Sequence, residues 1–178
     1  MRLFVAVHIP DEIREKLGAL GIEVKRHGEG IVPVKSGNMH LTLKFIGESD
    51  RADEIVKRLR EVPFAAFSCT VKGVGVFPTP QYVRVVWAGM ESGDALESLA
   101  KDVGGVLRGL GGDERFSAHV TIARVKRKVD LTDFLQKHRD EDFGTFTVPG
   151  FDLMESVLGK PGGPEYRVVA HFPFGSQS

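Results

Sequence analysis

The chain has 178 residues, and its 24 lysines and arginines balance 24 aspartates and glutamates, so its formal net charge is zero. This length, with 42% hydrophobic and 27% charged residues, is typical of a globular domain with a buried core, and it excludes an intrinsically disordered chain. The zero net charge disfavours a polybasic nucleic-acid coat or membrane anchor, although a local basic patch fits the composition.

A single cysteine, Cys69, limits the redox and metal chemistry that the chain can carry. One thiol can form no intramolecular disulfide and no cysteine-based zinc cage, and it favours the reducing environment of the cytoplasm. No apolar run in the sequence is long enough to cross a bilayer, so we expect no membrane partner. The histidines show no ligand spacing that predicts a metal site, so no metal is expected.

The first part of the chain reads as strands and helices in alternation. A run of apolar residues ends at Pro10 and predicts a strand, and the acidic pair Asp11 and Glu12 suits the first turn of a helix. In chain order, the expected elements are a strand at 2–9, a helix with Ile13, Leu17, Leu20 and Val24, a short strand at 31–34, a strand at 39–46, and a helix with Ile55, Val56 and Leu59 that ends before Pro63.

The second part is richer in strands. Two β-rich stretches are separated by Pro78-Thr79-Pro80, which predicts a hairpin with a proline-bearing loop. Ser92 suits the N-cap of a long amphipathic helix, and Gly111-Gly112 suits its C-terminal stop. Because hairpins and helices mix without a linker, the sequence predicts one α+β domain over 1–178, mainly of antiparallel sheets. The expected elements are strands at about 65–77 and 81–88, the helix from Ser92, a strand at 117–125, a short helix at about 130–137, and strands near 143–155 and 165–172 joined by the loop Gly159–Pro164.

Two copies of one tetrad are the most informative feature of the sequence. His40-Leu41-Thr42-Leu43 and His119-Val120-Thr121-Ile122 share the form His, apolar, Thr, apolar, and each falls in a predicted strand. Alternation along a strand places His and Thr on one face and directs the apolar pair into the core. The same alternation assigns Phe45 to the core and Lys44 to the face of His40. A single copy is weak ground, because Thr is a good strand former, but two copies in matched strands favour a functional pair.

Two imidazoles that face each other across a cleft can carry out acid–base chemistry at phosphorus. Imidazole titrates near neutral pH, so one ring can accept a proton while the other donates one. Threonine hydroxyls two residues away can bond the non-bridging phosphate oxygens. In an in-line displacement, one histidine deprotonates the attacking oxygen and the other protonates the leaving oxygen, with no metal and no covalent intermediate. The near-symmetric motifs alone do not decide which histidine is the acid.

The sequence resembles the 2H phosphoesterase superfamily, and more closely its RNA 2′,3′-cyclic phosphodiesterase branch, also called the 2′-5′ RNA ligase family. The resemblance extends beyond the tetrads over essentially the whole chain. The segments that carry it are Arg2-Leu3-Phe4-Val5-Ala6, the run from His40 to Glu48, Gly75-Val76-Phe77-Pro78, Arg84-Val85-Val86-Trp87, the run from His119 to Arg124, and Leu153-Met154-Glu155-Ser156.

The resemblance implies a bilobal α+β fold with pseudo-twofold symmetry, in which mainly antiparallel sheets flank a central cleft and helices cover the outer faces. It implies hydrolysis of RNA 2′,3′-cyclic phosphate ends to 2′-phosphates, with RNA such as tRNA fragments as the partner. On this chain, His40 would be the proton donor, His119 the proton acceptor, and Thr42 and Thr121 the phosphate-binding residues. No cofactor is implied, and the oligomeric state stays open, with a monomer favoured.

Two other functions stay open at this point. One is a sibling reaction, either ATP-independent ligation or cleavage of 2′-5′ RNA linkages or the opening of a small nucleotide cyclic phosphate. A long basic and aromatic surface beside the cleft would favour RNA, whereas a closed pocket would favour a small nucleotide. The other is a non-catalytic RNA- or nucleotide-binding module, in which the tetrads only hold phosphate. Tight binding that leaves the cyclic phosphate intact would support it.

Arg124 is a candidate phosphate-binding residue, since the family often carries an arginine after the second tetrad and its charge could neutralise phosphate. Simple alternation places it opposite His119, so a twist, a bulge or the end of the strand has to redirect it. Phe116 is the preferred base-stacking candidate, and Trp87 is assigned to the core. The remaining candidates are Phe77 and Tyr82 for stacking, Tyr166 for reaching the cleft, and Lys44, Arg115 and the run 124–128 for an RNA backbone.

Overall fold

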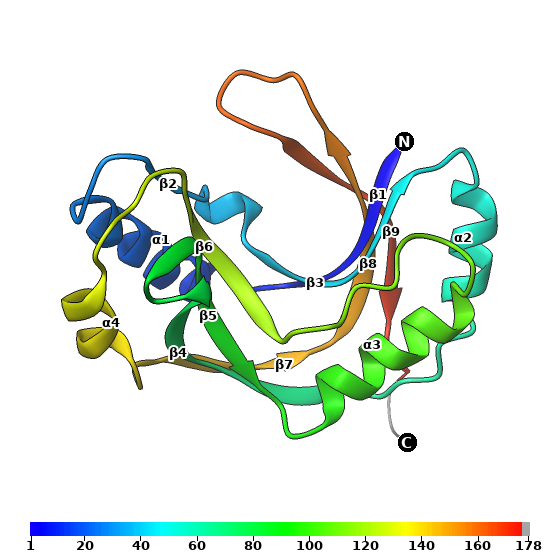
Figure 1. Cartoon of the computed structure of the whole chain (residues 1–178). Helices are drawn as coiled ribbons and strands as arrows, with labels where there is room; N and C mark the ends of the chain where they lie inside the picture. The colour runs from blue at the N-terminus through cyan, green and yellow to red at the C-terminus, as the bar shows by residue number, and fades with distance from the viewer. Residues whose placement is uncertain (176–178) are drawn as a thin grey trace.

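The chain forms an α+β fold in the computed structural model, which describes residues 1–175 (Figure 1). Within that range no helix is long and apolar enough to cross a membrane. The strands are β1 (Arg2–His8), β2 (Ile31–Pro33), β3 (His40–Glu48), β4 (Phe67–Thr79), β5 (Tyr82–Glu91), β6 (His119–Val125), β7 (Asp142–Val148), β8 (Gly150–Val157) and β9 (Glu165–Pro173). The helices are α1 (Asp11–Lys25), α2 (Ala52–Leu59), α3 (Ala95–Val106) and α4 (Thr132–His138), with the 3₁₀ turn η1 (Ser36–Asn38).

Two antiparallel sheets make up the β structure, and each contains one of the two tetrads. The first sheet has the strand order β3-β1-β8-β9, and the second has the order β2-β6-β5-β4-β7. Every strand pairing in both sheets is antiparallel. The tetrad strands β3 and β6 belong to different sheets and lie in contact with each other. The predicted α+β class with antiparallel sheets is therefore confirmed.

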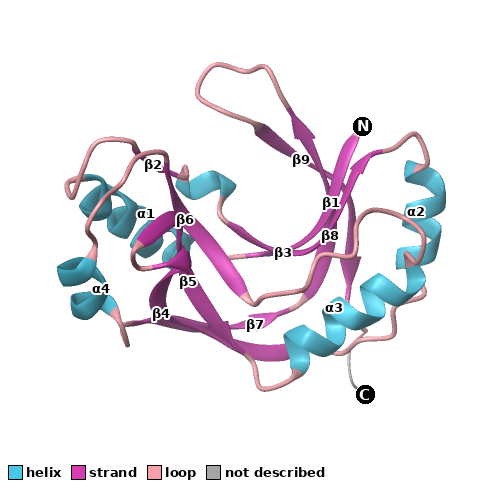
Figure 2. Cartoon of the chain, viewed as in Figure 1, coloured by secondary structure: helices cyan, strands magenta, loops and turns pink. Residues whose placement is uncertain are grey.

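The two lobes exchange helices, because each long helix packs on the sheet that does not contain the strand before it. Helix α1 follows β1 of the first sheet but packs against β2, β6 and β7 of the second. Helix α3 follows β5 of the second sheet but packs against β3 of the first. Figure 2 shows the result, with α1 and α4 at one end of the molecule and α2 and α3 at the other. One hydrophobic cluster includes residues of both sheets, so the lobes share a core.

The close packing of α1 on the second tetrad strand depends on Gly21. The helix buries the apolar residues that its sequence period predicts, and Gly21 lies among them. A Cβ atom at this position would lie 3.3 Å from Pro33 and 3.7 Å from Ile122. Because glycine lacks that atom, α1 can approach β6 closely and support the tetrad from behind.

The prediction of a single strand near 143–155 is wrong. The structure divides this segment at Pro149 into β7, which pairs with β4 in the second sheet, and β8, which pairs with β1 and β9 in the first. Proline has no backbone N–H to donate to a ladder, so the strand breaks there and the chain changes sheets. Each half has a strand-like sequence, and only the pairing partners reveal the break.

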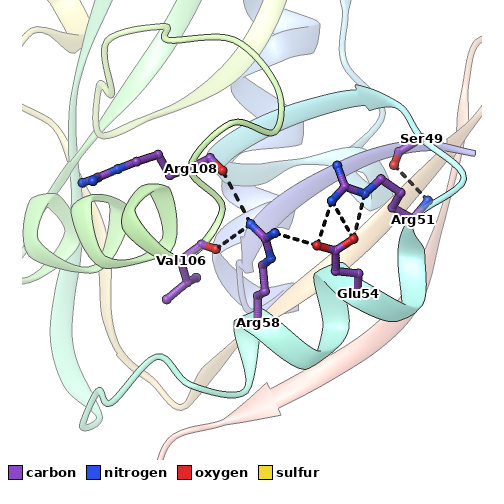
Figure 3. A network of polar contacts seen from close by, with 6 residues as sticks. All are labelled: Ser49, Arg51, Glu54, Arg58, Val106 and Arg108. Carbon is purple, nitrogen blue, oxygen red and sulfur yellow. Dashed lines mark hydrogen bonds and ion pairs between the residues drawn. The ribbon is translucent and has the colours of Figure 1, made fainter.

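Helix α3 ends at Val106, earlier than the stop predicted at Gly111. Two consecutive glycines at 104–105 weaken the last turn, since glycine is a poor helix former. Arg58 of α2 donates to the carbonyl oxygens of Val106 and Arg108, each at 3.5 Å (Figure 3). The end of a helix leaves carbonyl groups without backbone donors, and these hydrogen bonds supply a donor. They also join α2 to the end of α3.

Candidate active site

Each tetrad lies on its strand as the alternation predicts. His40 and Thr42 are half-buried on one face of β3, whereas the two leucines of that tetrad are buried on the other. Strand β6 repeats the pattern, with His119 and Thr121 half-buried and the two apolar residues fully buried. Strands β3 and β6 lie in contact, so the strands that carry the two tetrads adjoin each other.

Both imidazoles are held by the same kind of backbone contact. Nδ1 of His40 lies 2.7 Å from the carbonyl oxygen of Asn38, and Nδ1 of His119 lies 3.0 Å from that of Ser117. A carbonyl oxygen only accepts hydrogen bonds, so each Nδ1 carries a proton and donates it. Nε2 is therefore the atom of each ring that can exchange a proton with a ligand. In both tetrads, the imidazole bonds the carbonyl oxygen of the residue two positions earlier, as expected for two lobes related by pseudo-twofold symmetry.

His40 packs against two aromatic side chains. Its ring stacks on Phe4 with the centroids 4.9 Å apart, and it meets Tyr166 edge-on at 5.1 Å. Tyr166 also contacts Phe4 edge-on at 5.2 Å, so the two aromatic rings fix the plane of the imidazole. Burial lowers the pKa of His40 to about 4, and the hydrogen bond to Asn38 opposes only part of that effect. The ring is therefore neutral at neutral pH in the free protein.

His119 has a more open environment. Phe77 meets its ring edge-on at 5.2 Å, and Phe77 is itself 37% exposed. Burial lowers the pKa of His119, the contact with Ser117 raises it, and the positive charge of Arg124 lowers it. The net shift favours the neutral ring, which is the form that a general base requires.

A β-bulge follows the threonine of the first tetrad. Two residues of β3 follow Thr42 where the partner strand β1 supplies one, so Leu43 is the extra residue. The bulge disturbs the alternation, and the prediction that Phe45 belongs to the core is wrong. Phe45 is 56% exposed, and its ring centroid lies 6.2 Å from that of Phe4, on which His40 stacks. An exposed aromatic side chain therefore lies at the site, and alternation along the sequence missed it.

The second tetrad strand carries the matching bulge. Ile122 is the extra residue where β6 pairs with β5. Ile122 and Ala123 are consequently both buried, and Arg124 is exposed. This is the redirection that a phosphate-binding role for Arg124 requires. The charge of Arg124 also acts on the pKa of His119, so the two groups lie near each other.

The aromatic candidates fall in different places. Phe116 is half-buried and packs against the hydrophobic core. Trp87 is half-buried instead of lying in the core, and it pairs across the strands with the threonine of the second tetrad. Its indole covers Gly75, where any side chain would collide with the ring. Phe77 lies 5.3 Å from Trp87 and also contacts His119, so these two rings line the second tetrad.

The basic candidates differ in whether they have interaction partners within the protein. Lys44 donates from Nζ to the carbonyl oxygen of Gly112 at 2.9 Å, which ties β3 to the loop after α3. Arg127 pairs with Glu29 at 3.0 Å, whereas Arg115 is exposed. Lys44 and Arg127 thus have partners within the protein, and Arg124 is the basic candidate that the fold brings to a tetrad.

This arrangement can hold an anion between two groups that exchange protons. The imidazoles are both shifted toward their neutral forms, and two threonine hydroxyls and one guanidinium lie near them. Hydroxyl and guanidinium groups donate hydrogen bonds to phosphate oxygens. Among residues 1–175, no group of three or more His, Cys, Asp and Glu side chains could hold a metal ion.

Comparison with known proteins finds similar sequences and similar folds. The family model described as LigT like Phosphoesterase matches residues 7–87. The chain is 41% identical to an Archaeoglobus fulgidus protein named RNA 2′,3′-cyclic phosphodiesterase, over 97% of this chain and 99% of the relative. A solved structure from Thermus thermophilus has a TM-score of 0.80 at 31% identity. E. coli LigT complexed with 3′-AMP has a TM-score of 0.78 at 25% identity, and each structural comparison covers 98% of both chains.

Proposed function

The chain belongs to the LigT-like phosphoesterase family, and on this premise we propose that it hydrolyses RNA 2′,3′-cyclic phosphate ends to 2′-phosphates. The observation that carries the proposal is the pair His40 and His119, each with Nδ1 fixed to a backbone carbonyl and Nε2 left to exchange a proton. The name of the Archaeoglobus relative supports the same substrate class. Because both proton transfers belong to imidazoles, the reaction needs no metal.

The cyclic phosphate binds where the two tetrads meet. Thr42 and Thr121 donate their hydroxyl hydrogens to non-bridging oxygens, one from each sheet. Arg124 supplies a positive charge from the second lobe. Attack at phosphorus concentrates negative charge on these oxygens, so donors fixed in advance stabilise the transition state more than the substrate.

The displacement moves one proton at each end of the reaction. Nε2 of His119 takes a proton from water as the water oxygen bonds to phosphorus. Nε2–H of His40 gives a proton to the 3′ oxygen as the bond between phosphorus and that oxygen breaks. The product carries a 2′-phosphate and a free 3′-hydroxyl, and exchange with solvent restores both rings. The assignment of His40 as the acid follows the family resemblance.

His40 has to gain a proton before it can act as the acid. Its pKa of about 4 leaves the ring neutral in the free protein. A bound phosphate places negative charge beside the imidazole, and an opposite charge at that distance raises a histidine pKa. Substrate binding therefore protonates His40, while His119 stays neutral next to Arg124 and acts as the base.

The nucleobase next to the cyclic phosphate stacks on Phe45. This ring is 56% exposed and lies beside the Phe4 ring that holds His40, so a base can cover it without displacing protein atoms. Stacking on an aromatic face tolerates any base, which suits an enzyme that acts on RNA ends of varied sequence. Phe77, which is 37% exposed, offers a second aromatic surface at the other tetrad.

The one cysteine, Cys69, is a free thiol, which suits the reducing environment of the cytoplasm. Cys69 is buried and unpaired, and burial raises the pKa of its thiol to about 12. A thiol with so high a pKa is a poor nucleophile, so it does not compete with the histidine pair as the source of chemistry.

The test is the position of the phosphate in the product. The protein, treated with EDTA, is incubated with an oligoribonucleotide that ends in a 2′,3′-cyclic phosphate. We expect a 2′-phosphate end. A 3′-phosphate end, or an intact ring despite tight binding, would contradict the proposal. Joined or cleaved 2′-5′ linkages in place of ring opening would instead identify the sibling reaction.

A further inference from the structure

The tip of the β4–β5 hairpin carries an aromatic–cationic pair that the reaction at the tetrads does not use. The guanidinium carbon of Arg84 lies 4.4 Å from the ring centroid of Tyr82, and Arg84 also donates to the Tyr82 hydroxyl. A longer contact of 3.5 Å joins Arg84 to the carbonyl oxygen of Val125 on β6. Tyr82 is 55% exposed and Arg84 is exposed. The pair is therefore ordered in advance and open to a ligand, which lowers the entropy cost of binding.

This Tyr82–Arg84 pair lies on the face of the second sheet that carries the second tetrad. Val83 is buried in the core, so its neighbour Tyr82 projects from the opposite face. Arg84 is the extra residue of a β-bulge opposite Phe77, whose ring contacts His119, and it is exposed. Along β6, the stretch from His119 to Val125 spans roughly 20 Å at about 3.3 Å per residue. Measured along the strand, the residue that Arg84 contacts is therefore well past the tetrad, where the nucleotides upstream of one held at the histidines can meet the pair.

Two arginines without carboxylate partners, Arg84 on β5 and Arg124 on β6, lie on neighbouring strands of the second sheet. Arg84 and Arg124 take part in no ion pair within residues 1–175, whereas Arg51 and Arg58 both pair with Glu54. Arg84 contacts β6 at the residue that follows Arg124, so the two guanidinium groups come from neighbouring positions. Unpaired guanidinium groups on an open face are available to phosphates, and a stacked tyrosine–arginine pair suits a base of single-stranded RNA.

We propose that the Tyr82–Arg84 pair binds the RNA strand upstream of the nucleotide that carries the cyclic phosphate. The protein then prefers oligoribonucleotides to cyclic mononucleotides, because only the longer substrate reaches the hairpin tip. The inference rests on the proposed function, since it takes the cyclic phosphate to lie between His40 and His119. The upstream strand runs along β6 past Arg124, and an upstream nucleotide contacts the pair through its base or its phosphate.

The experiment compares the hydrolysis of a 2′,3′-cyclic mononucleotide with that of a short oligoribonucleotide ending in the same nucleotide. Arg84→Ala and Tyr82→Ala should each lower kcat/KM for the oligoribonucleotide about 5- to 10-fold relative to the mononucleotide, as expected for one stacking or phosphate contact. Tyr82→Phe keeps the ring and should retain most of the preference. Arg60→Ala, which removes the same charge from the exposed end of α2, is the control and should leave the ratio unchanged.

Binding gives a second readout that does not depend on turnover. The affinity for an oligoribonucleotide that already carries a 2′-phosphate end is measured over a range of salt concentrations. Arg84→Ala should reduce the slope of log affinity against log salt by about 0.7, the contribution of one phosphate contact to a single strand, and Arg60→Ala should not. An unchanged oligoribonucleotide preference together with an unchanged slope would overturn the inference. Failure of the wild-type protein to open any cyclic phosphate would contradict the proposed function instead, while the binding slope would still decide the role of Arg84.

Discussion

Phe45 and Arg124 occupy equivalent positions in the two lobes, each at the fifth position after the tetrad histidine and each exposed beyond a β-bulge. His40 and His119 are likewise equivalent, since both donate from Nδ1 to the carbonyl oxygen two residues earlier. The pseudo-twofold symmetry thus holds for the tetrad histidines and fails for the residues beyond the two bulges. At this position one lobe carries an aromatic side chain and the other a positive charge.

Replacement of Phe45 by alanine should weaken substrate binding without disabling the chemistry. The side chain is 56% exposed, so its loss leaves the core intact, and the stacked base loses about 1–3 kcal/mol of interaction. We expect KM to rise about tenfold for RNA and cyclic mononucleotides alike, with kcat within a factor of about two. Steady-state kinetics checks this. Phe45→Tyr is the control, and unchanged kinetics in Phe45→Ala would remove the stacking role.

Replacement of Arg124 by alanine should change both the rate and its pH dependence. The loss of one charged donor to the phosphate should lower kcat/KM by about 10- to 100-fold, and Arg124→Lys should recover part of it. Because the charge of Arg124 lowers the pKa of His119, its removal should move the limb of the pH profile that reports His119 toward higher pH. A lower rate with an unshifted pH profile would show that the charge of Arg124 does not act on the pKa of His119.

Alternation along the sequence predicted the tetrads as far as the bulges, and no further. His40 and Thr42 lie where the period of two places them, because β3 is regular up to Thr42. One extra residue, Leu43, then disturbs the alternation, and Phe45 is exposed instead of buried. A bulge depends on how two strands pair, which a single strand's pattern does not encode. For Arg124, the sequence did indicate that the side chain needs a feature such as a bulge to reach the face of His119.

The aromatic side chain at His119 was harder to predict, because it comes from a distant strand. Phe116 lies close to His119 in sequence and packs against the core, whereas Phe77 reaches the histidine from β4. The same reason explains the missed break at Pro149, since only the exchange of pairing partners between β7 and β8 shows it. The family resemblance predicted the fold class and the family correctly, because it draws on segments throughout the chain.

Binding of a phosphate ligand should be accompanied by proton uptake. His40 is neutral in the free protein, with a pKa of about 4, and a bound phosphate raises that value. Between the free and bound pKa values the complex holds more protons than its separate components. Calorimetry of a nucleoside 2′-phosphate in buffers of different ionisation enthalpy should therefore detect uptake of up to about one proton near pH 6. His40→Gln should abolish the uptake. Equal uptake in wild type and variant would place the proton elsewhere.

Burial of His40 should also make the fold sensitive to acid. The ring titrates near 6.5 when unfolded and at about 4 when folded, so the unfolded state binds more protons between these values. The stability that comes with a neutral His40 is fully present above about pH 6.5 and is lost as the pH falls toward 4. Denaturant unfolding should show that the free energy of unfolding of the wild type falls by about 2 kcal/mol more than that of His40→Asn between about pH 7 and pH 5. Parallel losses in the two proteins would contradict the low pKa.

The central claim is that His40 protonates the leaving 3′ oxygen while His119 activates water. Alanine at either position should reduce turnover of the natural substrate about 10²- to 10⁴-fold. The most direct measurement repeats this comparison with a cyclic phosphate in which sulfur replaces the bridging 3′ oxygen. A thiolate leaves without needing a proton, so we predict that the sulfur substrate restores most of the rate to His40→Ala and none to His119→Ala. Rescue of His119→Ala alone would reverse the two roles, and equal losses with both substrates in both variants would contradict acid–base catalysis by this pair.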